Sequence, residues 1–279
     1  MRRSRRGAGI LARYGRWAVV TGASEGIGEA TARALAAEGV SVVLIARREE
    51  RLRALADELA TAGVATKVLA LDLARPESAA AVAAATAALD VGLLVAAAGY
   101  GTSGAFLAAD VDDELAMLDV NCRSVLALCH AFAPRFAGRG RGGIVLMSSL
   151  LAFQGVPRAA NYAATKAFIQ SLAEGLRIEL RPSGVDVVAS APGPTRSGFA
   201  ARADMRITAA ETPAVVARET LHALGRAGTV RPGRLSKLLE ALLSPLPRSA
   251  RVRIMARIMD GMTRHQGDGK EPLSAGKPA

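Results

Sequence analysis

The chain has 279 residues, of which 51% are hydrophobic and only 4% aromatic, so we expect an aliphatic, alanine-rich core. Its formal net charge of +11 favours anionic partners such as phosphate cofactors, membrane surfaces or nucleic acid, although arginine-rich codon usage gives the same balance. No nucleic-acid-binding motif occurs, which argues against an RNA- or DNA-binding protein.

The first residues, MRRSRRGAGILARYGR, are basic without the apolar core of a signal peptide, and we expect residues 1–14 to form a basic arm. No apolar run approaches the roughly 18 residues of a membrane span, which predicts a soluble or peripheral protein of the cytoplasm. Cys122 and Cys129 lie seven residues apart in a predicted helix and are interpreted as buried, reduced thiols. Neither they nor the three scattered histidines have metal-ligand spacing, so no metal site is predicted.

Short apolar segments alternate with helical segments from residue 17 to residue 193. Each apolar segment is hydrophobic throughout, as in a strand that is buried on both faces. The predicted strands cover 17–21, 40–46, 66–73, 91–99, 142–149 and 185–193, and the predicted helices cover 28–38, 48–62, 77–88, 112–136 and 159–180. This order predicts an α/β protein with one doubly wound parallel sheet and helices on both faces, whose ligands lie off the carboxyl ends of the strands.

The loop after the first predicted strand is glycine-rich, with the sequence TGASEGIG (21–28). Gly22, Gly26 and Gly28 allow a tight turn and let backbone N–H groups at a helix N-terminus approach a phosphate. A tight turn alone would also explain these glycines. Their place between the first strand and the first helix favours a nucleotide site.

Two arginines follow the second predicted strand, and no Asp or Glu ends that strand. In dinucleotide-binding folds an acid near this point binds the ribose 2′-hydroxyl, whereas an arginine accommodates a 2′-phosphate. Arg47 and Arg48 also stand at a predicted helix N-terminus, where cations are unfavourable unless an anion binds there. We therefore expect NADP(H) rather than NAD(H), with simple capping of a solvated helix as the alternative.

The remaining strands end in further candidate residues. Asp72 follows the third strand, the small residues of AAAGYG (96–101) follow the fourth, and the rigid turn PGPT (192–195) follows the sixth. Ser148 and Ser149 follow the fifth.

A tyrosine and a lysine stand one helical turn apart in NYAATKA (161–167), shortly after Ser149. Tyr162 and Lys166 therefore share one face of a predicted helix. A free phenol has a pKa of about 10, too high for efficient acid–base catalysis near neutrality. We expect the positive charge of Lys166 to lower the pKa of Tyr162.

As an ordered set, these motifs resemble the short-chain dehydrogenase/reductase family. The resemblance covers roughly residues 15–225, and the opening YGRWAVVTGASEGIG is also similar to the branch of 17β-hydroxysteroid dehydrogenases and long-chain 3-oxoacyl reductases. It implies a Rossmann-like fold and a set of four catalytic residues. Tyr162 would donate a proton to a carbonyl oxygen, Lys166 would also bind the nicotinamide ribose, Ser149 would orient the substrate, and Asn121 would hold a water that links Lys166 to solvent.

The resemblance also implies which residues contact the cofactor. Asp72 would bind the adenine and Thr195 the nicotinamide carboxamide. The whole implied set is Gly22, Ser24, Gly26, Ile27, Gly28, Arg47, Arg48, Asp72, Leu73, Ala98, Gly99, Tyr162, Lys166, Pro192, Gly193 and Thr195. Ala96 and Ala97 depart from the family, many members of which have two asparagines there; this change affects cofactor binding or local packing but removes no catalytic group.

Residues 196–215 follow the sixth strand and are expected to form a substrate lid. Apolar side chains of the lid and of neighbouring loops would line a pocket that suits bulky hydrophobic carbonyls better than sugars. The expected lining residues are Tyr100, Leu150, Phe153, Val156, Phe199 and Met205. Ordinary anchoring of the loops is the alternative interpretation of these residues.

Residues 231–264 are expected to form an amphipathic helical extension, broken at Pro245 and Pro247. Its second half places Val252, Met255, Met259 and Met262 on one face, with Arg251, Arg253 and Arg257 interleaved. Such a helix lies on an anionic membrane, here through residues 235–262, packs on its own domain, roofs the substrate pocket or joins a dimer. The tail over 265–279 is expected to be disordered.

The sequence thus predicts an NADP(H)-dependent oxidoreductase that transfers a hydride between nicotinamide and a ketone or secondary alcohol. A lipophilic substrate such as a 3-oxoacyl thioester or a ketosteroid fits best, and the family implies a homo-oligomer, either a dimer or a tetramer. The alternative is a non-catalytic NADPH-binding sensor or scaffold, against which the complete Asn-Ser-Tyr-Lys set argues.

Overall fold

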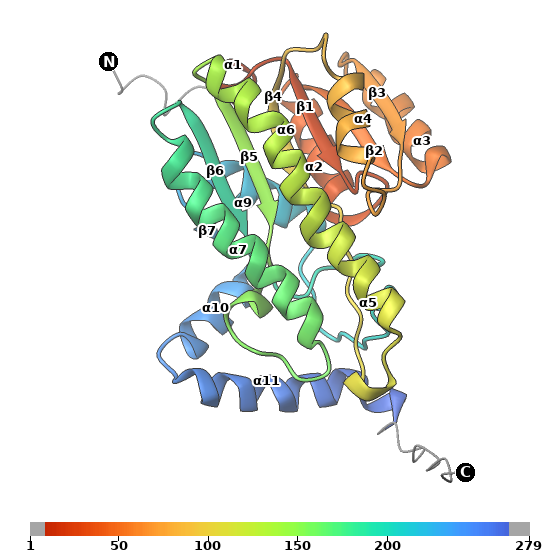
Figure 1. The fold of residues 1–279 in the computed structure, drawn as a ribbon, viewed down its shortest axis with the longest axis vertical. Helices are drawn as coiled ribbons and strands as arrows, with labels where there is room; N and C mark the ends of the chain where they lie inside the picture. Colours follow the sequence, from red (N-terminus) through yellow and green to blue (C-terminus); the bar gives the residue numbers. More distant parts are fainter. Residues whose placement is uncertain (1–8, 268–279) are drawn as a thin grey trace, which may run out of the picture.

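A single parallel sheet organises the chain, as a computed structural model that describes residues 9–267 shows (Figure 1). Its seven strands run in the order β3-β2-β1-β4-β5-β6-β7, so the order reverses between β1 and β4. The strands are β1 (Trp17–Thr21), β2 (Ser41–Ala46), β3 (Thr66–Ala70), β4 (Val91–Ala96), β5 (Gly142–Met147), β6 (Val185–Ser190) and β7 (Thr229–Val230). The predicted fold class is confirmed.

The six predicted strands are all present, but several end earlier than predicted. Residues 71–73, 97–99 and 191–193 lie beyond the strand ends and form the loops at the carboxyl edge of the sheet. The seventh strand, β7, was not predicted, because two residues pairing with β6 carry no periodicity that a sequence pattern could reveal.

Helices cover both faces of the sheet and enclose two hydrophobic clusters. On one face lie α1 (Ile10–Tyr14), α2 (Gly26–Ala37), α3 (Glu49–Ala60) and α9 (Pro213–Ala223). On the other lie α4 (Ser78–Ala85), α6 (Ser124–Gly138) and α7 (Ala160–Leu180). Adjacent strand residues, such as Val19 and Val20, point to opposite clusters, which explains why the central strands are largely apolar. The edge strand β3 has no buried residue, contrary to the prediction of a strand that is apolar throughout.

The stretch predicted as a basic arm contains a short helix, which corrects the prediction for its last five residues. In α1, Ile10 and Tyr14 are buried against the first cluster. Arg13 and the hydroxyl of Tyr14 both donate hydrogen bonds to Asp186 at the start of β6. Residues 1–8 lie outside the described part of the chain.

The helix predicted over 112–136 is not uniform. It consists of α5 (Val111–Leu118), a π-helical turn (Asp119–Arg123) and α6. The π turn contains Asn121, and π turns inside helices occur frequently at functional sites.

Taken together, Val111–Gly138 is long and apolar enough to cross a membrane by length and composition alone, which contradicts the expectation that no apolar run approaches that length. Its large apolar residues Leu128, Phe132 and Phe136 are fully buried and belong to the cluster under the sheet. Burial against the sheet therefore accounts for part of the apolar composition of this helix, whereas Val111, Leu115, Leu118 and Leu126 are exposed.

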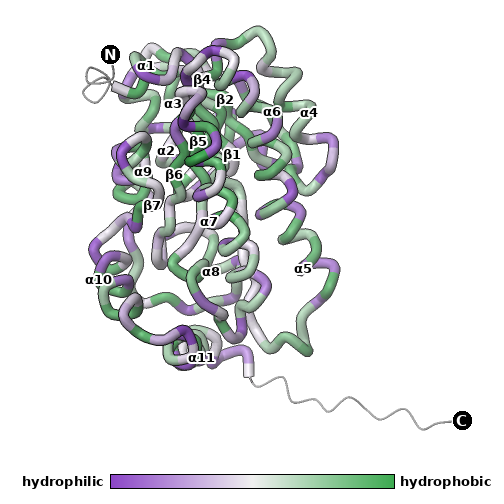
Figure 2. The backbone as a smooth tube through the Cα atoms, turned by 60° about the vertical axis from the view of Figure 1, so that its left-hand side comes forward, coloured by the Kyte–Doolittle hydropathy of each residue, from purple (hydrophilic) through white to green (hydrophobic). Residues whose placement is uncertain are grey.

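The remaining described helices lie beyond the carboxyl ends of the strands. The predicted lid contains α8 (Phe199–Arg202), and the C-terminal extension forms α10 (Arg234–Leu243) and α11 (Arg248–Thr263). Short 3-10 turns occur at Phe106–Ala108, Leu150–Phe153 and Arg264–Gln266. Figure 1 shows α11 crossing below the ends of α5 and α7, and Figure 2 shows the same segment from another side, away from the hydrophobic strands. The predicted disorder of the tail falls mainly on residues 268–279, outside the described part.

Candidate active site

One cavity of about 730 Å³ lies at the carboxyl edge of the sheet, between the glycine-rich loop and α11. It is lined by every predicted cofactor residue and by Ser149, Tyr162 and Lys166. Of the predicted pocket residues, Tyr100, Leu150, Phe153, Phe199 and Met205 also line it. Only Asn121 and Val156, among all the predicted site residues, stand behind the cavity wall.

Tyr162 lies on the first turn of α7 and is only 8% exposed. Burial raises the pKa of Tyr162 to about 12, and a hydrogen bond with Ser149 lowers it in part. The net shift of this pKa is therefore opposite to the predicted lowering, because loss of solvation of the phenolate dominates. Ser149 itself follows β5 and accepts a hydrogen bond from the backbone N–H of Leu151, which fixes its rotamer.

Lys166 lies one turn after Tyr162, and its Nζ is 5.7 Å from the centre of the tyrosine ring. The ammonium donates a hydrogen bond of 2.9 Å to the carbonyl of Met147, at the end of β5. Burial lowers the pKa of Lys166 to about 8. Its charge is thus held in place by a backbone dipole and is sensitive to pH near neutrality.

Asn121 connects the loop after β4 to α7. Its Nδ2 donates to the carbonyl of Tyr100 at 2.8 Å and to the hydroxyl of Thr165 at 3.1 Å, while its Oδ1 accepts from the backbone N–H of Tyr100 at 3.1 Å. A Cβ placed on Gly99 would lie 2.9 Å from Asn121 Oδ1 and 3.3 Å from Lys166 Nζ. Glycine at this position therefore lets the loop pass close to both side chains.

The glycine-rich loop has the close backbone approaches that its sequence predicts. Gly22 and Gly26 have φ values of +67° and +62°, which side chains other than glycine rarely adopt. A Cβ on Gly28 would overlap the carbonyl of Gly22, so only glycine allows α2 to start this close to β1. The N-terminus of α2 consequently faces the cavity.

The two arginines after β2 differ in their surroundings. Arg48 donates a hydrogen bond of 3.0 Å to Ser24 and forms an ion pair of 3.0 Å with Glu25, both on the glycine-rich loop. Arg47 is exposed at the rim of the cavity and has no ion pair among the residues that the structure describes. Nearby, the Asp72 carboxylate accepts from the backbone N–H of Ala74, which shapes the loop after β3.

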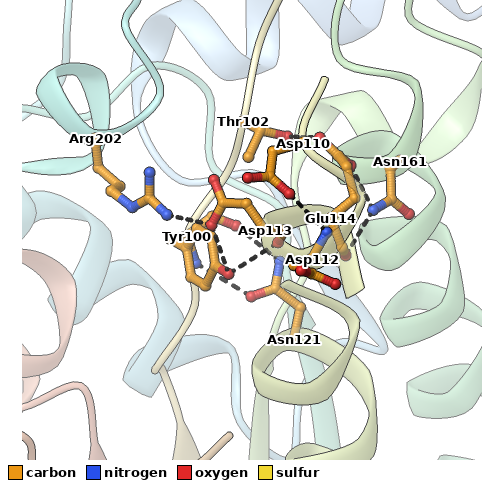
Figure 3. Close-up of polar contacts among 9 residues, drawn as sticks. All are labelled: Tyr100, Thr102, Asp110, Asp112, Asp113, Glu114, Asn121, Asn161 and Arg202. Carbon is orange, nitrogen blue, oxygen red and sulfur yellow. Dashed lines mark hydrogen bonds and ion pairs between the residues drawn. The ribbon is translucent and has the colours of Figure 1, made fainter. Parts of the chain in front are cut away.

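The lid is held to α5 by a polar cluster that Figure 3 shows. Arg202 of α8 forms an ion pair with Asp113, and its guanidinium lies 4.7 Å from the centre of the Tyr100 ring. The hydroxyl of Tyr100 donates to the backbone carbonyl of Asp113 at 3.1 Å.

In the same view, Glu114 of α5 accepts hydrogen bonds from Thr102 and from Asn161, the first residue of the NYAATKA motif. No sequence pattern predicted either set of contacts, because each one joins segments that are distant in the chain.

The C-terminal extension closes the cavity from the far side. On this side the cavity is lined by four residues of α11, namely Met255, Ile258, Met259 and Met262. Of the alternatives that the sequence left open for this helix, the structure therefore shows a roof over the cavity. Val156 does not line the cavity, which corrects the prediction, since it is buried behind the wall in the same apolar cluster as Met255 and Met259.

The other half of the extension contacts the loop after β6. Ser236 of α10 accepts a hydrogen bond of 2.8 Å from the backbone N–H of Gly193, in the PGPT turn. A Cβ on Gly193 would lie 3.0 Å from the same hydroxyl. The extension therefore reaches both the roof of the cavity and the turn that was predicted to contact nicotinamide.

This fold and this arrangement of side chains are those of a dinucleotide-dependent oxidoreductase. The family model for short chain dehydrogenase matches residues 16–207, and the chain belongs to that family. Its members transfer a hydride between a nicotinamide cofactor and a hydroxyl or keto group, so the protein is an oxidoreductase of this kind. The predicted family is confirmed.

Known relatives fall in the branch that the sequence predicts. A 7beta-hydroxysteroid dehydrogenase of Collinsella aerofaciens is 34% identical over 235 residues, which cover 81% of this chain and 89% of that protein. A very-long-chain 3-oxoacyl-CoA reductase of Podospora anserina is 38% identical over 186 residues, which cover 63% of this chain and 55% of that protein.

Solved structures agree with these relatives. A structure described for 7beta-hydroxysteroid dehydrogenase stereoselectivity has a TM-score of 0.81 and 30% identity, and covers 89% of this chain and 99% of that chain. A short-chain dehydrogenase from Sphingobium yanoikuyae in complex with NADPH has a TM-score of 0.73 and 31% identity, and covers 84% of this chain and 97% of that chain.

The residues present fit a nicotinamide dinucleotide. The glycine-rich loop offers backbone N–H groups at a helix N-terminus for a pyrophosphate, and small residues at Ala97 and Ala98 leave the adjoining wall open. The cationic rim at Arg47 and Arg48 suits an additional phosphate. No group of three or more metal-binding side chains occurs within residues 9–267.

Proposed function

We propose that this protein is an NADPH-dependent reductase of bulky lipophilic ketones, which works reversibly as a secondary-alcohol dehydrogenase. The observation that carries the proposal is the single cavity in which the glycine-rich loop, the Ser149–Tyr162–Lys166 group and the apolar roof of α11 meet. A hydride-transfer site open at one end to a dinucleotide and at the other to an apolar ligand fits this reaction.

The cofactor preference rests on the loop after β2. Arg47 is exposed at the rim, and Arg48 is held by Ser24 where a ribose phosphate would lie. No carboxylate ends β2 to bind a 2′-hydroxyl. Relatives of known structure, including the one in complex with NADPH, support the same preference.

The chain's own residues would handle the proton and the orientation of the substrate. A bound nicotinamide supplies or accepts the hydride. Tyr162 keeps its proton at neutral pH, because burial raises its pKa to about 12, and donates it to the substrate oxygen as negative charge develops there. Ser149 holds that oxygen against Tyr162, and Lys166 stabilises the phenolate that is left.

Asn121 acts as a positioning residue in this proposal. Its three hydrogen bonds fix the loop at Tyr100 relative to α7, which holds Gly99 against Lys166. The proton relay through a water at Asn121, implied by the family, stays a prediction.

The substrate class follows from the wall beyond Tyr162. The Phe199 ring lies 5.1 Å from the Tyr162 ring, and methionines of α11 continue the apolar surface. Methionine side chains adapt to irregular apolar shapes. Ketosteroids and long 3-oxoacyl compounds, the kinds of molecule named in the relatives, are therefore the first substrates to test.

The test is a paired titration of the protein with NADPH and NADH, followed by steady-state reduction of ketones. We expect tighter binding of NADPH, and Arg47→Ala should lower the ratio of NADPH to NADH affinity by about tenfold, as loss of one charge-assisted phosphate contact does. Arg16→Ala, an arginine at the opposite end of β1, is the matched control and should leave the ratio unchanged. Equal affinities in the wild type would refute the preference, and binding without turnover of any ketone would favour a sensor.

Three further predictions concern assembly and location, and the titration does not test them. A homo-oligomer, placement in the cytoplasm and contact of residues 235–262 with a membrane surface stay predictions. The roof position of α11 favours packing on its own domain, because its methionine face is occupied.

A further inference from the structure

The arginine at the start of the roof has a side chain without a partner. Arg251 lies in the first turn of α11 and lines the cavity. Its Nε is buried and makes no hydrogen bond, and no hydrogen bond or ion pair of its side chain is found within residues 9–267. A buried guanidinium N–H without an acceptor is unfavourable and points to a ligand that would supply one.

The other arginines on the substrate side of the cavity are neutralised by neighbours. Arg202 is paired with Asp113, and Arg231 forms an ion pair of 2.7 Å with Glu240 while lying 4.5 Å from the centre of the Phe153 ring. Among the described residues, Arg251 therefore contributes a positive charge to the cavity lining that no ion pair compensates.

An apolar wall leads from this charge towards Tyr162. Met255 follows Arg251 by one turn and Met259 by two, so the three side chains share one helix face. Both methionines belong to the same apolar cluster as Tyr162. From Arg251 to Met262 the wall extends about 16 Å along the helix axis, which is long enough for a fused ring system or an extended acyl chain.

We propose that Arg251 is an anion-binding residue that holds the carboxylate of a lipophilic keto acid while the ketone meets Tyr162. This inference rests on the proposed function and adds the charge and polarity of the substrate. A carboxylate matches the planar guanidinium fork and would satisfy the buried Nε. The substrate would thus be amphipathic, with its carboxylate and its ketone at opposite ends of an apolar body.

The experiment compares acids with their methyl esters, so that charge is the variable. The probes are a ketosteroid with a carboxylate side chain, a long-chain keto acid with its ketone distant from the carboxylate, and the methyl ester of each. In the wild type we expect kcat/KM to be higher for an acid than for its ester by about tenfold to a hundredfold, as for a charge-assisted hydrogen-bonded pair. Arg251→Met should bring that ratio close to one, and Arg251→Lys should leave it in between.

The ratio separates charge recognition from folding and from catalysis, because a general defect lowers both rates together. Arg253→Met is the matched control, since Arg253 is exposed on the same helix and does not line the cavity; it should keep the wild-type ratio. The pair with the higher ratio of acid to ester kcat/KM, steroid or acyl, would show which kind of apolar body the wall accepts.

Two results would overturn the inference in different ways. If the wild type reduces acids and esters alike, or if Arg251→Met leaves the ratio unchanged, the Arg251 subsite is wrong while the proposed reductase stands. If neither acids nor esters are reduced although NADPH binds, the proposed function itself fails, and the subsite fails with it.

Discussion

Burial, more than charge, sets the ionisation of the two central side chains. It raises the pKa of Tyr162 to about 12 and lowers that of Lys166 to about 8. The sequence showed that the two residues share a helix face, but it could not show how far each is removed from water. For this reason the spacing of Tyr162 and Lys166 was predictable and the direction of the tyrosine shift was not.

The proton-donor role of Tyr162 predicts a large loss on Tyr162→Phe. General acid catalysis contributes about a hundredfold to ten-thousandfold, so kcat for ketone reduction should fall by that factor while NADPH affinity stays within about twofold. Tyr14→Phe is the control, because Tyr14 is equally buried but bonded to Asp186 and does not line the cavity. Full turnover by Tyr162→Phe with every substrate of the wild type would remove Tyr162 from the mechanism.

The depressed pKa of Lys166 predicts a limb in the pH profile. With a pKa of about 8, Lys166 is charged below that pH and neutral above it, so kcat/KM for reduction should fall by about tenfold per pH unit above pH 8. Tyr162 stays protonated through this range and cannot cause the limb. Lys166→Arg keeps its charge at all these pH values, so its profile should lose the limb even if its rate is lower. If kcat/KM of that variant still fell above pH 8, the titrating group would be one other than Lys166.

The helices and strands were predictable where a long run of residues repeats one pattern. The central strands are largely apolar because both faces of the sheet are covered, and that pattern is visible in the sequence. The edge strand β3 departs from it, since Lys67 is exposed and no residue of the strand is buried. Three elements were not predicted, because their stability comes from contacts with distant segments. They are the π turn at Asn121, the helix at Ile10–Tyr14 and the two-residue strand β7. The ion pair between Arg202 of the lid and Asp113 was not predicted, for the same reason.

The ion pair between Arg202 and Asp113 predicts a modest contribution of the lid to substrate binding. Both side chains are partly exposed, so the pair and the stacking on Tyr100 should together change KM by only about twofold to fivefold. Arg202→Gln and Asp113→Asn should each raise KM, and the double variant should be no worse than either one. Arg196→Gln, an exposed arginine of the same lid, is the control. Additive losses in the double variant would show that the two residues act separately.

The apolar clusters around the sheet are separate from the cluster beneath the roof helix α11. The clusters on either face of the sheet support the glycine-rich loop, whereas a third cluster joins α11 to Tyr162, Met117 and Val156. The sequence predicted the extension and its methionine face but could not decide what that face covers. The answer depends on how the extension folds back below the ends of α5 and α7 (Figure 1), and no local pattern determines that path.

The separate clusters predict that damage to the roof affects the substrate and spares the cofactor. Replacing Met255 and Met259 together with alanine removes buried apolar surface worth about 1.5–3 kcal/mol per side chain, so KM for a neutral lipophilic ketone should rise at least tenfold. NADPH affinity should stay within about threefold, because the glycine-rich loop packs on the sheet. Fluorescence titration and steady-state kinetics measure the two effects on one preparation. Met255→Leu, which nearly conserves volume, should change neither constant by more than a small factor. If the double alanine variant lost NADPH affinity as much as substrate affinity, the roof and the cofactor loop would form one cooperative unit, contrary to the packing that the structure shows.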